Sequence, residues 1–159
     1  RREISVWQKS MWTRTRAWAY TYAATPHTLT EAYKAAMRAY DRKDWPLALE
    51  YFQQVLYVEP TSADIQYHIG EVYRFQGLLT EAEKAYDASL KINPAYAPAY
   101  LGKGRVMLMN ASHDTDLVRE QFEKALQLDP QQFEAYVELA QLEDGVALGT
   151  QLDGQGREA

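Results

Sequence analysis

The chain lacks cysteine altogether among its 159 residues, which excludes disulfide bonds and thiolate chemistry. It also lacks any run approaching the about 18 apolar residues that a membrane-spanning helix needs, and no signal-peptide core is present. Basic residues are few after residue 27, where 12 Lys and Arg stand against 21 Asp and Glu. Because nucleic acids bind basic surfaces, this acidic body argues against nucleic acid as a partner.

Catalytic and metal-binding patterns are scarce as well. The three histidines, His27, His68 and His113, are far apart in sequence, and no nucleophile stands beside a base. The Gly102-Lys103-Gly104 triplet is a fragment of a phosphate-binding loop, but it falls inside a predicted helix, where small residues more simply mark a helix crossing. We therefore expect a noncatalytic chain without a metal or a cofactor.

What the sequence does contain is a period. Pro26, Pro60 and Pro94 lie 34 residues apart, and Pro130 follows 36 residues later. A small or β-branched residue and a ring four positions on recur in the same phase, as Ala48 and Phe52, Ala82 and Tyr86, Val118 and Phe122. Between the prolines, apolar residues recur at spacings of three and four, the pattern of amphipathic helices. A period of this length predicts stacked helix pairs that cannot fold alone.

The turn residues place the helices. The predicted ranges are 29–42, 45–58, 62–76, 79–92, 96–109, 115–128 and 132–143. Pro46 suits a first helical turn, where its missing N–H costs little, and Gly77 separates the second pair. Thr80 and Glu83 have the spacing of a capping box. The third pair has a loop two residues longer than the second, which explains the interval of 36 before Pro130.

The middle copy carries a recognisable signature, consisting of Ile69, Gly70, Tyr73, Gly77, Ala82, Tyr86, Leu90 and Pro94. With its neighbours it resembles the tetratricopeptide repeat (TPR) family over residues 29–144. The resemblance implies an all-α, right-handed superhelical solenoid of stacked antiparallel helix pairs. It would have about three full repeats, a C-terminal single helix and an N-terminal helix. We expect a basic aromatic helix in residues 1–27, the solenoid in 28–144 and a flexible glycine-rich tail in 145–159.

The resemblance also implies a partner-binding groove, because the first helix of each pair lines the concave face in this family. The residues expected there are Tyr33, Met37, Tyr40, Tyr67, His68, Glu71, Arg74, Phe75, Leu101, Arg105 and Leu108. Among them Tyr67, Arg74 and Arg105 are the leading candidates, since a polar group on that face is expected to have no packing role. Aromatic side chains, Met and Arg are the types enriched at binding hot spots.

One subtype of the family is disfavoured. Members that bind chaperone tails clamp a carboxylate with Lys, Asn and Arg, whereas the matching places here hold Tyr33, Met37, His68, Pro98 and Gly102. The expected partner is another protein that supplies a peptide or helix segment of apolar or apolar-basic character. The leading hypothesis is therefore a noncatalytic protein-interaction scaffold.

The N-terminal segment leaves three alternatives open. Residues 1–27 carry a net charge of +4, and Ile4, Trp7, Met11, Trp18 and Tyr22 have the spacing of an amphipathic helix. This helix would cap the solenoid, contact a membrane through residues 1–24 in a membrane-associated assembly factor, or join copies into a homo-oligomer. Because the chain begins with Arg1, we expect a processed protein or a fragment, including the regulatory TPR domain of a larger enzyme.

Overall fold

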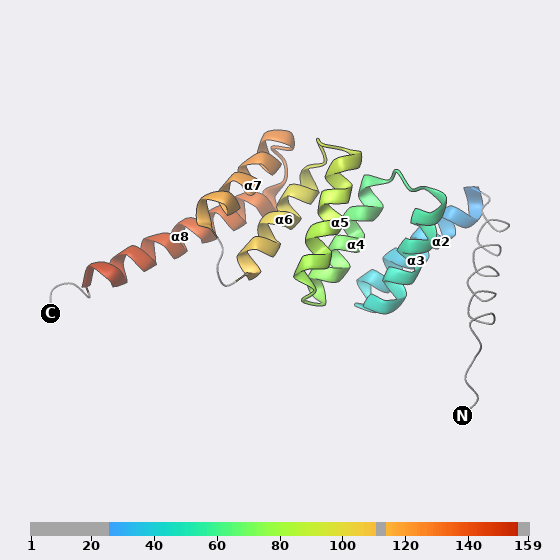
Figure 1. Ribbon diagram of the computed structural model, residues 1–159, viewed down its shortest axis with the longest axis horizontal. Helices are drawn as coiled ribbons and strands as arrows, with labels where there is room; N and C mark the ends of the chain where they lie inside the picture. The colour runs from blue at the N-terminus through green and yellow to red at the C-terminus, as the bar shows by residue number, and fades with distance from the viewer. Residues whose placement is uncertain (1–25, 111–113, 156–159) are drawn as a thin grey trace, which may run out of the picture. The chain divides into compact units, whose positions relative to one another are not determined.

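The computed structural model describes residues 26–110 and 114–155, with side chains for 29–110 and 114–145. This part of the chain is helical and contains no strand, so the all-α prediction is confirmed (Figure 1). Its helices are α2 (Pro26–Asp41), α3 (Trp45–Val58), α4 (Ala63–Phe75), α5 (Leu79–Ile92), α6 (Ala97–Met109), α7 (Thr115–Leu128) and α8 (Phe133–Gln155). None of these described helices is long and apolar enough to cross a membrane. The expected helix within residues 1–24 lies outside the described residues.

The chain divides into two compact units at Ile65 and Gln66. In the first unit, α2 and α3 pack as a pair around the ring of Phe52, which is fully buried together with Ala36 and Ala48. The rings of Tyr33 and Tyr40 each meet Phe52 edge-on, with centroids 6.5 Å away. The predicted role of the 34-residue ring position is therefore confirmed here.

The turn between α2 and α3 follows from its side chains. The carboxylate of Asp44 accepts a hydrogen bond from the backbone N–H of Leu47 at 3.3 Å, and Pro46 lies in the first helical turn as predicted. Lys43, just before the cap, has φ of 60°, a left-handed conformation that L-residues seldom adopt. Gly77 occupies the corresponding place 34 residues later with φ of 76°.

Two predicted helix starts were wrong. Helix α2 begins at Pro26, three residues before the expected start, so Pro26 opens this helix and does not close the preceding segment. Proline suits the first helical position because its φ is already helical and its missing N–H would have no helical partner. Helix α5 begins at Leu79 with Leu78 as its cap, and no side chain caps it. Thr80 therefore lies inside the helix, and the predicted capping box is not formed.

The second unit is built around two more rings. Tyr86 of α5 and Phe122 of α7 are both fully buried, and glycines of the preceding helices lie against them. A Cβ atom added to Gly70 would lie 2.6 Å from Cε1 of Tyr86, and one added to Gly104 would lie 2.3 Å from Cε1 of Phe122. Glycine is therefore required at both crossings, as the sequence predicts. Gly102 also packs against Tyr86, which confirms that its triplet marks a helix crossing.

Helix α8 is longer than the sequence suggests. It continues to Gln155, although the predicted helix ended at residue 143 and residues 145–159 were expected to form a flexible tail. Gly145 lies within the helix with no neighbouring atom within 4 Å, and an interior glycine costs a helix only about 1 kcal/mol relative to alanine. Since no proline follows before Gln155, nothing in this stretch stops the helix.

Candidate functional site

The predicted groove residues fall in both units. Those of the first unit, Tyr33, Met37 and Tyr40, lie on α2 and are half-buried. The hydroxyl of Tyr33 donates to Oδ2 of Asp64 at 3.1 Å. Burial, followed by the charge and hydrogen bond of Asp64, raises the pKa of Tyr33 above its ordinary value. Both tyrosines also pack on Phe52, so they serve the core of this unit whatever else they contact.

In the second unit the structure brings four predicted residues to one place. An open hollow of about 490 Å³, which we call the α4–α6 hollow, is lined by Arg74, Phe75, Arg105, Leu108, Met109 and Glu138. Phe75 and Met109 are 49% and 50% exposed at the ends of α4 and α6, while Leu108 is half-buried. The hollow thus combines three apolar side chains with three charged ones.

Both arginines of the hollow are held by carboxylates. Nε and Nη2 of Arg74 donate to Oε1 and Oε2 of Glu71 at 3.0 and 2.7 Å, one helical turn away. Nε of Arg105 donates to Oε1 of Glu138 on α8 at 2.7 Å. The Arg74 guanidinium also lies over the ring of Phe75, 4.3 Å from its centroid. These contacts fix the side chains in place and neutralise much of their charge.

Glu71 is the buried centre of a polar cluster. It is 3% exposed, and besides Arg74 it accepts a hydrogen bond from the hydroxyl of Tyr86. Burial, followed by the charge and hydrogen bond of Glu71, raises the pKa of Tyr86 above its ordinary value. Burial lowers the pKa of Arg74, but the hydrogen bond and charge of Glu71 outweigh it and the net pKa is raised. Since a buried carboxylate is costly without partners, this cluster is part of the core.

The structure corrects three expectations about the groove. Leu101 is only 3% exposed and packs in the core with residues of α7 and α8, and Glu71 is equally buried. Neither presents a surface to a partner. Tyr67 lies 6.0 Å from the Tyr86 ring and 5.8 Å from the Tyr96 ring, measured between centroids. The reasoning that Tyr67, Arg74 and Arg105 have no packing role was therefore wrong. His68, beside Tyr67, is half-buried.

Glu138 is the residue of the hollow that the sequence did not reveal. It is 33 positions from Arg105 and belongs to α8, which the repeat pattern identifies only as an additional helix. Its ion pair with Arg105 has both side chains about four-fifths buried, with exposed fractions of 23% and 20%. Opposite charges about one repeat apart are the signal that was available, because consecutive first helices of a solenoid lie side by side.

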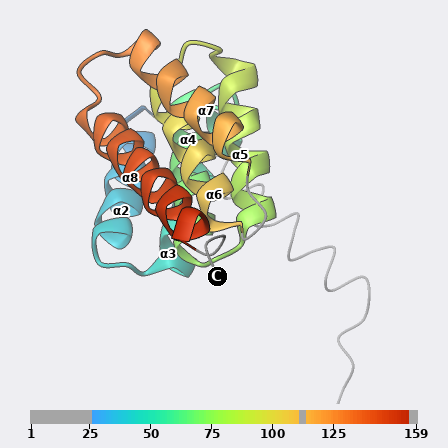
Figure 2. The ribbon, with the colours of Figure 1, turned by 90° about the vertical axis from the view of Figure 1, so that its left-hand side faces the viewer.

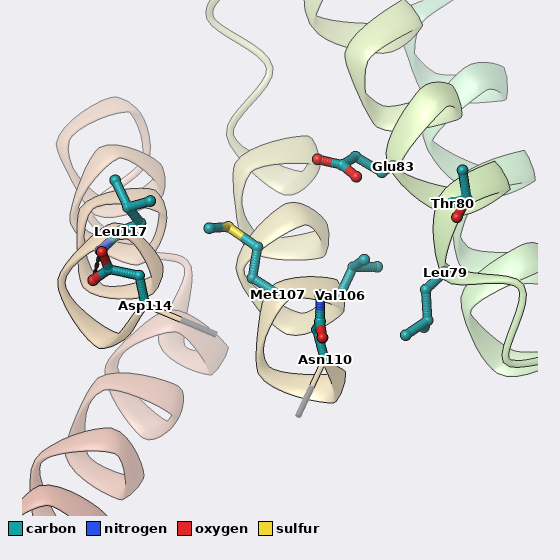
Figure 3. Close-up of a pocket in the computed structure, with 8 residues that line it drawn as sticks. All are labelled: Leu79, Thr80, Glu83, Val106, Met107, Asn110, Asp114 and Leu117. Atoms are coloured by element: carbon teal, nitrogen blue, oxygen red, sulfur yellow. Dashed lines mark hydrogen bonds between the residues drawn. The ribbon is translucent and has the colours of Figure 1, made fainter. Parts of the chain in front are cut away.

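A second hollow of about 340 Å³ lies between α5, α6 and α7 (Figure 3). Its apolar lining includes Val106, Met107 and Leu117, with Met107 pointing from α6 toward Leu117 on α7. Its Asp114 carboxylate is already engaged by the backbone N–H groups of Asp116 and Leu117 as the cap of α7. Among the described residues, no group of three or more His, Cys, Asp or Glu side chains is arranged to hold a metal ion.

Comparison with known proteins agrees with this geometry. A family model for the tetratricopeptide repeat matches residues 33–97, from α2 to the first residue of α6. The chain belongs to the tetratricopeptide repeat family. The TPR domain of Sgt2 from Aspergillus fumigatus superposes with a TM-score of 0.70 at 18% identity, covering 81% of this chain and 85% of that one. The TPR fold predicted from the 34-residue period is thus confirmed.

Two further relatives differ in what they add. The first TPR domain of Spaghetti (RPAP3), solved with the HSP90 peptide SRMEEVD, has a TM-score of 0.67 at 16% identity and covers 79% of this chain and 98% of that chain. In sequence, the RNA polymerase-associated protein CTR9 of Caenorhabditis elegans is 26% identical over 97 residues. That match covers 60% of this TPR chain but only 8% of the relative's length.

Proposed function

We propose that this TPR chain is a noncatalytic protein-interaction module that holds a short apolar segment of another protein in the α4–α6 hollow. The observation that carries the proposal is the pairing of two half-exposed apolar side chains, Phe75 and Met109, with ion-paired arginines beside them. Large exposed apolar side chains rimmed by polar groups are typical of peptide-binding surfaces.

The charges in the hollow favour a neutral or weakly basic ligand over an acidic one. Arg74 and Arg105 are each bound to a carboxylate, so a ligand carboxylate would have to compete with Glu71 or Glu138. Each guanidinium has five N–H donors and uses one or two of them in these bonds. The others suit backbone carbonyl groups of a bound segment, which would fix its direction while Phe75 and Met109 take its apolar side chains.

The RPAP3 structure provides a useful contrast. The peptide in its title, SRMEEVD, ends in acidic residues. In this chain the places predicted for a carboxylate clamp hold Tyr33, Met37, His68, Pro98 and Gly102, none of which is Lys or Arg. We therefore expect SRMEEVD to bind this chain weakly, even though the two folds are alike.

The test uses peptides selected on the whole chain from a phage-displayed random library. Their binding is then measured by fluorescence polarisation against a double variant, Phe75→Ser with Met109→Ser. Leu117→Ser is the matched control, because Leu117 is 48% exposed on α7, away from the α4–α6 hollow. We expect apolar peptides that lose affinity by about tenfold or more in the double variant and keep it in the control.

The alternatives give different results. Peptides that bind both variants like the original chain would refute the hollow as the binding site. Enrichment of acidic peptides, or tight binding of SRMEEVD, would refute the expected ligand chemistry. Tyr67 and Arg74 are poor choices for this test, because each also contacts the core around Tyr86.

A further inference from the structure

Helix α8 presents an apolar face away from the core of its own unit. Phe133, Tyr136 and Val137 are 72%, 49% and 54% exposed, and Ala140 is exposed one turn further on. Their spacing of three, four and seven places them on one side of the helix. Ala135 and Leu142, on the opposite side, are buried in the core. Figure 2 views this unit from the α8 side, with α8 in front of α6 and α7.

The same face is covered in the preceding repeat. Shifting back by 36 residues, the interval between Pro94 and Pro130, turns Phe133 into Ala97, Val137 into Leu101 and Ala140 into Gly104. These three residues of α6 are buried, and the ring of Phe122 on α7 lies against Gly104. No described helix plays the part of α7 for α8. Its face therefore has the form of a repeat's first helix that awaits a second, with small Ala140 where a ring would pack.

The N-terminal segment has the sequence of such a second helix. Trp18 lies 34 residues before Phe52, which lies 34 before Tyr86, so it holds the ring position of the repeat. The small-residue position four places earlier is occupied by Arg14. Residues 1–27 carry a net charge of +4 in all. The segment is therefore aromatic and basic.

The face of α8 has the opposite charge. Residues 133–145 contain no Lys or Arg, and Glu134, Glu143 and Asp144 are exposed beside the apolar stripe. We propose that residues 1–25 of a second copy of this chain dock on this face of α8, with Trp18 placed against Ala140. Each copy then offers one acceptor face and one donor segment, which gives a head-to-tail contact that can repeat from copy to copy.

The experiment measures the mass of the full chain by light scattering and sedimentation velocity over a concentration series. The unaltered chain is expected to grow in mass with concentration, and less so at high salt, because part of the attraction is between exposed charges. Val137→Glu, on the acceptor face, and Trp18→Ser, on the donor segment, are each expected to weaken self-association by about tenfold or more. Leu117→Glu, at a similarly exposed apolar position on α7, is the control that should leave it unchanged.

Mixing the two variants identifies the geometry of the contact. The Val137→Glu copy retains a working donor segment and the Trp18→Ser copy a working face, so an equimolar mixture should form a dimer that grows no further. A chain that stays monomeric at every concentration overturns the proposal. So does a mixture that fails to pair, as when each segment covers its own α8, or self-association that survives Trp18→Ser, as when two α8 faces meet directly.

Discussion

Replacing Gly104 by alanine tests the packing that defines each helix crossing. In an unobstructed helix interior this change should stabilise the fold by about 1 kcal/mol, since glycine is the poorer helix former. Here the new Cβ would lie 2.3 Å from Cε1 of Phe122, whereas carbon atoms prefer about 3.5–4.0 Å. Phe122 is fully buried and has no open space to enter, so the overpacking should cost about 1–3 kcal/mol. The expected net change therefore runs from neutral to a loss of about 2 kcal/mol.

A matched control separates this packing effect from helix propensity. Gly145 also lies in a helix, but no atom comes within 4 Å of its added Cβ, so Gly145→Ala should stabilise by up to about 1 kcal/mol. Urea denaturation followed by far-UV circular dichroism gives both free energies of unfolding. Adding Phe122→Leu to Gly104→Ala should recover part of the loss, with a coupling of about 0.5–3 kcal/mol. If Gly104→Ala stabilises the chain as much as Gly145→Ala, the proposed steric conflict is refuted.

Two further predictions concern the turns and the buried polar cluster. Lys43→Gly should stabilise the chain by about 0.5–1 kcal/mol in thermal denaturation, because it relieves the strain of a φ of 60°, whereas Gly77→Ala should destabilise it by a similar amount; equal effects of one sign would contradict this reasoning. Because the pKa of Tyr86 is raised in the folded chain, its contribution to stability is complete below the ordinary tyrosine pKa of about 10. It should fall above that pH by up to about 1.4 kcal/mol per pH unit. Urea denaturation at rising pH should show a shallower loss in Tyr86→Phe than in the unaltered chain, and equal slopes would exclude Tyr86 as the titrating group.

The fold could be predicted closely from the sequence because its turn residues are strong local signals. Pro46 and Gly77 placed helix boundaries to within a residue or two. Gly70 and Gly104 identified the crossings, because only a residue without a side chain fits against a buried ring. The end of α8 was missed since Gly145 weakens a helix without stopping it.

The candidate site was harder to predict, because spacing along one helix says little about what the next helix brings. Glu71 lies on the same side of α4 as Arg74, and the pattern therefore assigned it to the groove. Its burial depends on Tyr86, 15 residues away on α5. Similarly, Leu101 is buried by residues of α7 and α8. The spacing of three between Glu71 and Arg74 is itself the pattern of an ion pair, and it was the available sign of the cluster.

The hydroxyl of Tyr86 makes the middle repeat different from its neighbours. At the same phase the other two pairs carry Phe52 and Phe122, which have no group to offer a carboxylate. If α4 were paired with α7 instead of α5, Glu71 would be buried against a phenyl ring with one partner fewer, at a cost of about 1–3 kcal/mol. A single oxygen atom thus gives α4 a means of distinguishing its own second helix from the others, so the repeats are not interchangeable parts. Shuffling or duplicating them would have to move Glu71, Arg74 and Tyr86 together.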